Sequence, residues 1–109
     1  MNLSDIPFGI TDWSLVDRTE HAGTRGAAFW RTQTFGGIRV RIVDYSADYL
    51  ADHWCTKGHI LLCLEGELVT ELKDGRTFTL TPGMSYQVAD DEEAHRSTTA
   101  VGCKLFIVD

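Results

Sequence analysis

The chain has no long hydrophobic run and few basic residues, and each scarcity excludes a class of protein. The N-terminal residues 1–7 lack the basic stretch and the apolar core of a secretory signal, so we expect neither a signal peptide nor a membrane span. Ten Lys and Arg residues against sixteen Asp and Glu residues give a net charge of −6. This balance argues against nucleic acid as a partner, because no basic cluster could follow the phosphates.

Cysteine is also scarce, with three copies that cannot all pair in disulfides. An odd number of thiols is typical of a reducing compartment, where cysteines are buried or bind metals, so we expect a cytoplasmic protein. At 109 residues, of which 43% are hydrophobic, the chain has room for one core and for no second domain.

Helical periodicity is almost absent, and short apolar segments alternate with turn residues instead. Gly36-Gly37 and Asp74-Gly75 are typical hairpin turns, and residues 38–43 alternate apolar and basic side chains as a half-buried strand does. The pattern predicts strands over residues 28–35, 38–43, 49–55, 59–64, 67–72, 77–80, 84–88, 95–99 and 103–108. Such spacing indicates an all-β, antiparallel sandwich or barrel over residues 25–109. Residues 1–24 show no clear period, and we expect them to form an arm that packs on the barrel.

Four side chains with metal-binding chemistry lie at the predicted strand ends: His53, Cys55, His59 and His95. Residues two apart on an extended strand point to the same side, so His53 and Cys55 are expected to share one face. His59 heads the next predicted strand, and His95 begins a later one. Imidazole and thiolate groups are ligands of transition metals, so we predict a site for one divalent ion, Zn, Fe, Ni or Mn. His21 fits no such pattern.

The spacing of the first three ligands resembles the first motif of the cupin superfamily, whose usual form is His-x-His, three or four residues, Glu, six residues, Gly. The run here is His53-x-Cys55-x3-His59-x6-Gly66. Cys55 stands where the motif has its second His, and His59 stands where it has Glu.

A second stretch is similar in part to the second cupin motif, Pro-Gly-Asp followed about a dozen residues later by His. It is matched by Pro82-Gly83-Met84 and His95, while residues 89–94 replace the usual Pro-x-Gly. Residues 52–55, Asp-His-Trp-Cys, further resemble the small bacterial DHCW-motif cupin fold proteins, whose biochemical role is not assigned.

The resemblance implies a single-domain, jelly-roll-like cupin β-barrel that binds one metal and acts on a small organic molecule, as a dioxygenase, isomerase or lyase. The alternative is a non-catalytic module that binds or senses a metal or small molecule. With Cys55 as a ligand, three nitrogens and one sulfur approach the tetrahedral set that zinc favours. If Cys55 turns away as an apolar filler, three imidazoles leave positions open for substrate. The sequence decides neither question.

Two more residues are candidates for binding a substrate, namely Tyr86 and Arg41. Tyr86 shares its parity with Met84 and Val88 and is expected to face inward. Arg41 could hold a substrate carboxylate from inside the barrel. Its alternation with apolar neighbours, shared with Arg39, favours instead an exposed basic stripe.

The strand that begins at His59 is apolar on both faces. If His59 faces the metal, then Ile60, Leu62 and Leu64 face outward and form an apolar patch. Such a patch is unusual on a monomer, and twofold symmetry is the commonest way to cover it, so we expect a homodimer.

Overall fold

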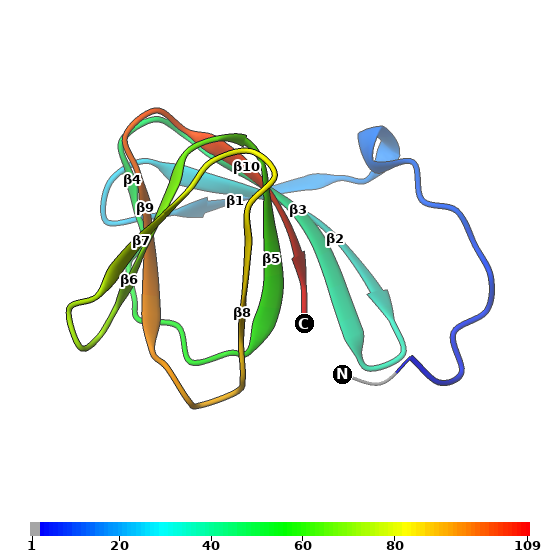
Figure 1. Cartoon of the computed structure of the whole chain (residues 1–109). Helices are drawn as coiled ribbons and strands as arrows, with labels where there is room; N and C mark the ends of the chain where they lie inside the picture. The colour runs from blue at the N-terminus through cyan, green and yellow to red at the C-terminus, as the bar shows by residue number, and fades with distance from the viewer. Residues whose placement is uncertain (1–2) are drawn as a thin grey trace.

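The computed structural model describes residues 3–109 as two antiparallel sheets that face each other (Figure 1). The larger sheet has the strand order β1-β2-β3-β10-β5-β8, and the smaller has the order β4-β9-β6-β7. After a short 3-10 helix, η1, at Trp13–Leu15, the strands are β1 (Arg18–Ala22), β2 (Ala27–Phe35), β3 (Ile38–Tyr45), β4 (Tyr49–Leu50), β5 (His59–Gly66), β6 (Leu68–Leu72), β7 (Thr77–Leu80), β8 (Ser85–Val88), β9 (His95–Thr99) and β10 (Cys103–Val108).

The core lies between the two sheets and is formed by alternate residues of their strands. Val43, Leu61 and Leu105 from the larger sheet and Leu68 from the smaller are almost completely buried. Burial of one such side chain contributes about 1.5–3 kcal/mol to folding. The alternation that predicted the strands is thus the alternation that forms the core.

The prediction of an all-β, antiparallel fold is confirmed. In residues 3–109 the two sheets share no strand and are not closed into one continuous barrel. This described part contains no helix with the length and hydropathy of a membrane span.

One predicted strand is wrong in its extent. The strand expected over residues 49–55 ends at Leu50, because the chain bends at Asp52 and His53, whose side chains contact each other through Oδ1 and Nδ1 at 2.7 Å. Cys55 returns to an extended backbone as a single bridge to His95. The argument that His53 and Cys55 share a strand face therefore fails.

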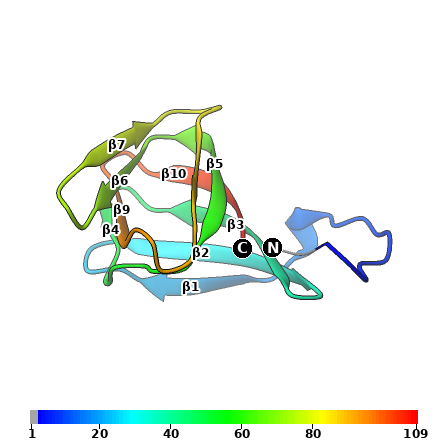
Figure 2. The same ribbon diagram turned by 60° about the horizontal axis from the view of Figure 1, so that its bottom comes forward.

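The predicted arm includes an edge strand that the sequence pattern did not indicate. β1 pairs with β2, and Arg31 Nη1 donates a hydrogen bond to the carbonyl oxygen of Val16 at 2.6 Å. Residues 1 and 2 of the arm lie outside the described part. The segment before η1 loops out beside the β2–β3 hairpin (Figure 2), and its side chains Phe8 and Ile10 are 95% and 89% exposed.

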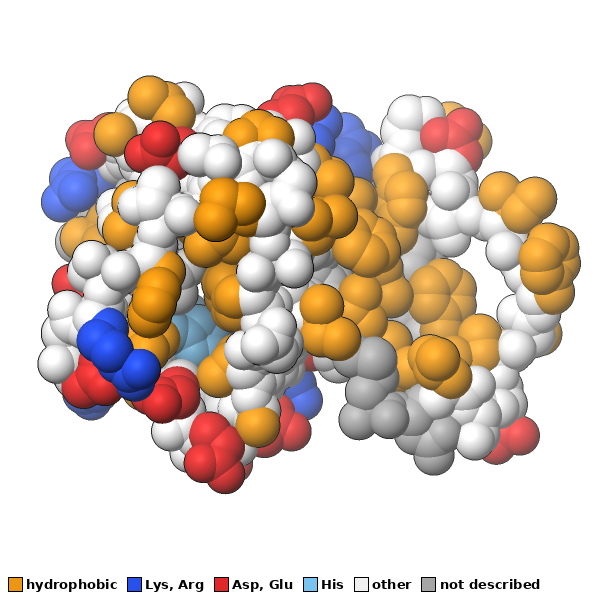
Figure 3. Space-filling model, in the orientation of Figure 1, with side chains coloured by type: hydrophobic (Ala, Val, Ile, Leu, Met, Phe, Trp, Pro, Cys, Tyr) orange, Lys and Arg blue, Asp and Glu red, His pale blue; other side chains and the backbone are white. Residues whose placement is uncertain are grey.

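The outer face of the larger sheet carries an apolar patch on β5, β10 and β3. Ile60 and Leu64 are exposed, while Leu62 lies half-buried beside Phe106, and Phe106 lies opposite Ile42 across β10 and β3. Apolar side chains gather between the sheets and the arm in the space-filling view (Figure 3). This outer apolar face retains the character that the sequence predicted.

Candidate metal centre

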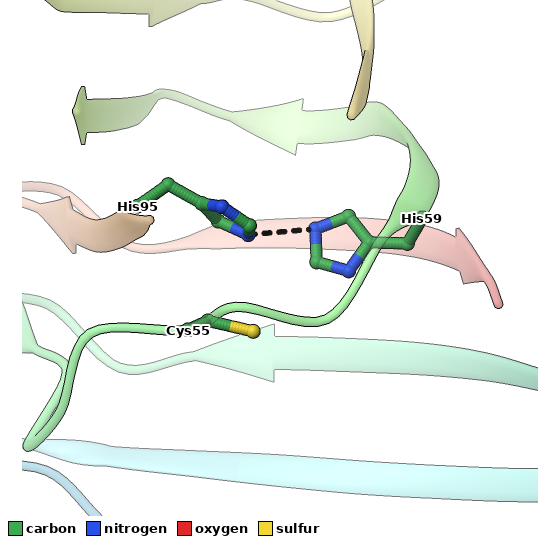
Figure 4. A group of neighbouring side chains, drawn as sticks. All are labelled: Cys55, His59 and His95. Carbon is green, nitrogen blue, oxygen red and sulfur yellow. Dashed lines mark hydrogen bonds between the residues drawn. The ribbon is translucent and has the colours of Figure 1, made fainter. Parts of the chain in front are cut away.

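Three of the four predicted ligands meet between the sheets. His59 begins β5 and His95 begins β9, while Cys55 lies in the segment before β5. Two backbone hydrogen bonds fix Cys55 against His95, one of 2.7 Å from Cys55 N and one of 3.0 Å from His95 N. The sulfur of Cys55 and one ring nitrogen from each histidine all lie within 4.8 Å of one another (Figure 4).

The His95 ring is held in a defined orientation. Its Nδ1 lies 2.8 Å from the carbonyl oxygen of Glu93, which can only accept, so Nδ1 carries the proton. Nε2 of His95 points at Nε2 of His59, 3.2 Å away. Two imidazoles bound to one tetrahedral zinc ion at about 2.0–2.1 Å would place their nitrogens about 3.3 Å apart. The observed spacing fits a single ion shared by both rings.

His59 is buried and has unequal surroundings at its two nitrogens. Burial, and then the nearby charge of His95, lower its pKa to about 4, so the ring is neutral at pH 7. Nε2 also contacts the Tyr86 hydroxyl at 2.9 Å. Nδ1 has no hydrogen-bond partner among the described residues and lies 3.9 Å from Oδ2 of Asp109. A proton on Nδ1 would face this carboxylate and leave the Nε2 lone pair for a metal.

Cys55 is half-buried beside the two imidazoles. Hydrogen bonding to His95 lowers the pKa of its thiol, and the same contact raises the pKa of His95. The thiolate is the form that binds metals, so this environment favours the ligand form of Cys55. Two imidazole nitrogens and one thiolate sulfur are a set that zinc and iron accept, and the residues therefore fit a transition metal.

His53 does not join this group. Its ring is 72% exposed and contacts Asp52, although the residue lines the same cavity as the other three. The chain bends at Asp52 and His53, and His53 is not part of the group of donor atoms that lie together.

A cavity of about 310 Å³ adjoins the three donor residues, and both predicted substrate-binding residues line it. Tyr86 reaches in from β8, as expected from its parity, and burial raises the pKa of its hydroxyl, which stays a neutral donor. Arg41 is buried on the inner face of β3. The interpretation of Arg41 as part of an exposed basic stripe is therefore wrong. The buried carboxylate of Asp109 pairs with Arg41 and makes the burial of its charge possible.

The arrangement of strands is shared with solved structures of low sequence identity. Ectoine synthase from P. lautus matches with a TM-score of 0.75 and 20% identity, over 93% of this chain and 76% of that chain. Iron(II) HppE matches with a TM-score of 0.77 and 19% identity, over 98% and 62% of the two chains. A cupin-superfamily sugar phosphate isomerase from Silicibacter pomeroyi matches with a TM-score of 0.72 and 14% identity, over 92% and 74%.

The chain has the cupin fold. No protein-family model and no curated protein matches the sequence, so the likeness is one of fold. Of the residues that resemble the first cupin motif, His53 and Cys55 lie in the segment before β5, while His59 begins β5 and Gly66 ends it. His95 begins β9.

Sequence reasoning missed one residue of this candidate site, Asp109. Its side chain is 1% exposed and accepts hydrogen bonds from Arg39 at 2.9 and 3.0 Å and from Arg41 at 3.1 Å. Burial raises the pKa of the carboxyl, but the hydrogen bond from Arg39 and the charges of both arginines outweigh it, so the pKa is lowered. The signal available was the pair Arg39 and Arg41 on one strand face, which needs an acidic partner if that face is inside.

A second, apolar hollow of about 240 Å³ meets the first at Tyr86 and His95. Leu72, Phe78 and Val88 line it. A histidine ring is visible at the bottom of a hollow in the space-filling view (Figure 3).

Proposed function

We propose that this cupin binds one divalent transition metal through Cys55, His59 and His95, and acts on a small organic molecule in the adjoining cavity. The observation that carries the proposal is the convergence of three donor atoms within 4.8 Å on the wall of a 310 Å³ cavity. Two structural neighbours, an iron(II) form of HppE and a sugar phosphate isomerase, support this combination of metal and small molecule.

The number of donors favours a catalytic centre of the dioxygenase, isomerase or lyase type. Structural zinc sites use four protein ligands, whereas catalytic sites use three and keep one position for water or substrate. The bound ion would supply Lewis acidity and that open position. Three clustered donors beside a cavity match the second kind of site.

The remaining residues have roles that follow from their contacts. The Glu93 carbonyl fixes the His95 ring, and Asp109 faces Nδ1 of His59. With a metal on Nε2 of His59, the neutral hydroxyl of Tyr86 would be free to donate a hydrogen bond to a molecule in the cavity. Tyr86, which the sequence predicted as a substrate-binding residue, would thus be a proton-bearing group beside the proposed centre.

A non-catalytic binding or sensing module is the second candidate, and the position of His53 favours it. His53 lines the same cavity, so a turn of its exposed ring would bring a fourth donor toward the site. Four protein ligands would close the coordination sphere, and a closed sphere stores or senses a metal without turnover.

Metal quantification on protein purified without a histidine tag tests both proposals. We expect about one equivalent of metal in the wild type, and a sharp loss in Cys55→Ser, His59→Ala and His95→Ala, because two donors hold a divalent ion far more weakly than three. His21→Ala is the matched control and should keep its metal. His53→Ala should also keep it if the site has three ligands, and lose it if the site is closed. Full occupancy in His59→Ala and His95→Ala would overturn the metal proposal.

A further inference from the structure

The cavity is cationic although the chain carries a net charge of −6. Four basic side chains line the cavity, namely Arg39, Arg41, Lys57 and Arg96. Among the described residues, no Asp or Glu lines it. An acidic protein that gathers basic groups around one internal cavity holds a local field that attracts anions there.

The excess charge lies on the two arginines of β3. Lys57 is paired with Asp90 at 3.8 Å, and Arg96 with Glu71 at 2.8 Å. Arg39 and Arg41 share the single side-chain carboxylate of Asp109, so one positive charge is left over among these three groups.

Arg41 holds that charge in the more enclosed position. Its side chain is 8% exposed, against 38% for Arg39, and its Nε has no hydrogen-bond partner among the described residues. Burial, and then the charge of Arg39, lower the pKa of Arg41, as expected for a cation that is incompletely neutralised. A buried charge of this kind is stabilised by a ligand of opposite charge.

Arg41 is also close to the proposed metal centre. Oδ2 of Asp109 lies 3.1 Å from Nη2 of Arg41 and 3.9 Å from Nδ1 of His59, so these two nitrogens are at most about 7 Å apart. The guanidinium stacks on the ring of Trp30 at 4.6 Å, and the stacked rings of Tyr45 and Tyr49 also line the cavity. An anion held by Arg41 would therefore have an organic body among aromatic rings, beside the metal ligands.

We propose that the ligand of this cavity is a small organic carboxylate, whose negative charge pairs with Arg41 and whose body lies toward His59 and Tyr86. A planar guanidinium matches a carboxylate in geometry, and the single side-chain carboxylate of Asp109 does not balance both arginines. This inference rests on the proposed function, because the carboxylate would be the substrate of the same site.

Isothermal titration with matched acids and amides tests the inference. Benzoate and benzamide, and hexanoate and hexanamide, are each titrated into wild-type protein that has been stripped with a chelator and dialysed, at low ionic strength. We expect at least one of the carboxylates to bind about tenfold or more tightly than its amide, and added salt to weaken it. Equal binding of acids and amides, or no saturation by either acid at 10 mM, would overturn the inference.

Variants assign the preference to Arg41. Arg41→Met should abolish the preference for the acid, and Arg41→Lys should keep part of it, because the charge remains without the planar fork. Arg76→Met is the matched control, since Arg76 forms an exposed ion pair with Asp74, and it should bind as the wild type does. Urea denaturation checks that each variant is folded, and Arg41→Lys replaces Arg41→Met if the latter is not. An unchanged preference in a folded Arg41→Met variant would refute the assignment.

The outcomes separate this inference from the proposed function. If the protein binds a metal but shows no preference for carboxylates, the metal centre stands and the ligand class is wrong. If stripped protein prefers carboxylates through Arg41 but never takes up a metal, the cavity binds an organic anion and the metal proposal fails.

Discussion

Asp109 is predicted to be the most sensitive polar residue of the fold, and Asp109→Asn is the variant that shows it. The carboxylate is 1% exposed and accepts hydrogen bonds from two arginines. Breaking a buried ion pair from one side costs about 3–5 kcal/mol, because a charge is left unpaired. Arg39 is 38% exposed, so water recovers part of this loss, and the Asn oxygen can still accept. We expect a fall of about 2–4 kcal/mol in the free energy of unfolding.

Urea denaturation followed by circular dichroism measures this change, and Asp48→Asn is the control. Asp48 pairs with Arg25 at 3.4 Å with both side chains largely exposed, and its loss should change the free energy of unfolding by at most about 0.5 kcal/mol. An Asp109→Asn variant as stable as the Asp48→Asn variant would show that the buried cluster does not stabilise the fold.

Three further predictions concern assembly, acidity and thiols. We propose a homodimer through the outer apolar face, so light scattering should give twice the chain mass of 12.2 kDa. Leu62→Glu should shift the dimer toward monomer or insolubility. A wild-type monomer at micromolar concentration would contradict the proposal. In the metal-free protein the free energy of unfolding should fall as the pH drops from 6.5 toward about 4, because His59 takes up a proton near pH 6.5 in the unfolded chain but only near pH 4 in the folded protein. Equal dependence of the free energy of unfolding on pH in the wild type and in His59→Gln would refute this prediction. Cys55 should be alkylated before Cys103, because burial raises the pKa of Cys103 to about 12. Bound metal should slow the alkylation of Cys55, and an alkylation rate of Cys55 that metal does not change would contradict its role as a ligand. The three cysteines, Cys55, Cys63 and Cys103, are all free thiols.

The parts of the fold that local pattern specifies were predictable from the sequence. Residues 77–80, 95–99 and 103–108 form strands with the predicted bounds, because turn residues flank short segments of strand-forming side chains. β1 was missed because all but one of its residues are exposed and lack apolar alternation, and only pairing with β2 keeps it extended. The early end of β4 depends on a contact between Asp52 and His53 that no periodicity encodes.

The site also contains residues that local pattern could predict and residues that it could not. The motif spacing brought Cys55, His59 and His95 to attention, since two of them begin strands and the third is next to one. Asp109 could not be found locally, because its partner Arg39 is 70 residues away and meets it only through the register of β3 and β10. For the same reason the sequence favoured an exposed Arg41.

The metal centre is tested most directly by anomalous diffraction from crystals of protein purified without a histidine tag. Data collected on both sides of the absorption edges of zinc, iron, nickel and manganese would identify the ion and its position. We predict one anomalous peak between Nε2 of His59, Nε2 of His95 and Sγ of Cys55. A map with no peak at these three atoms, from protein whose metal content was measured before crystallisation, would contradict the metal centre.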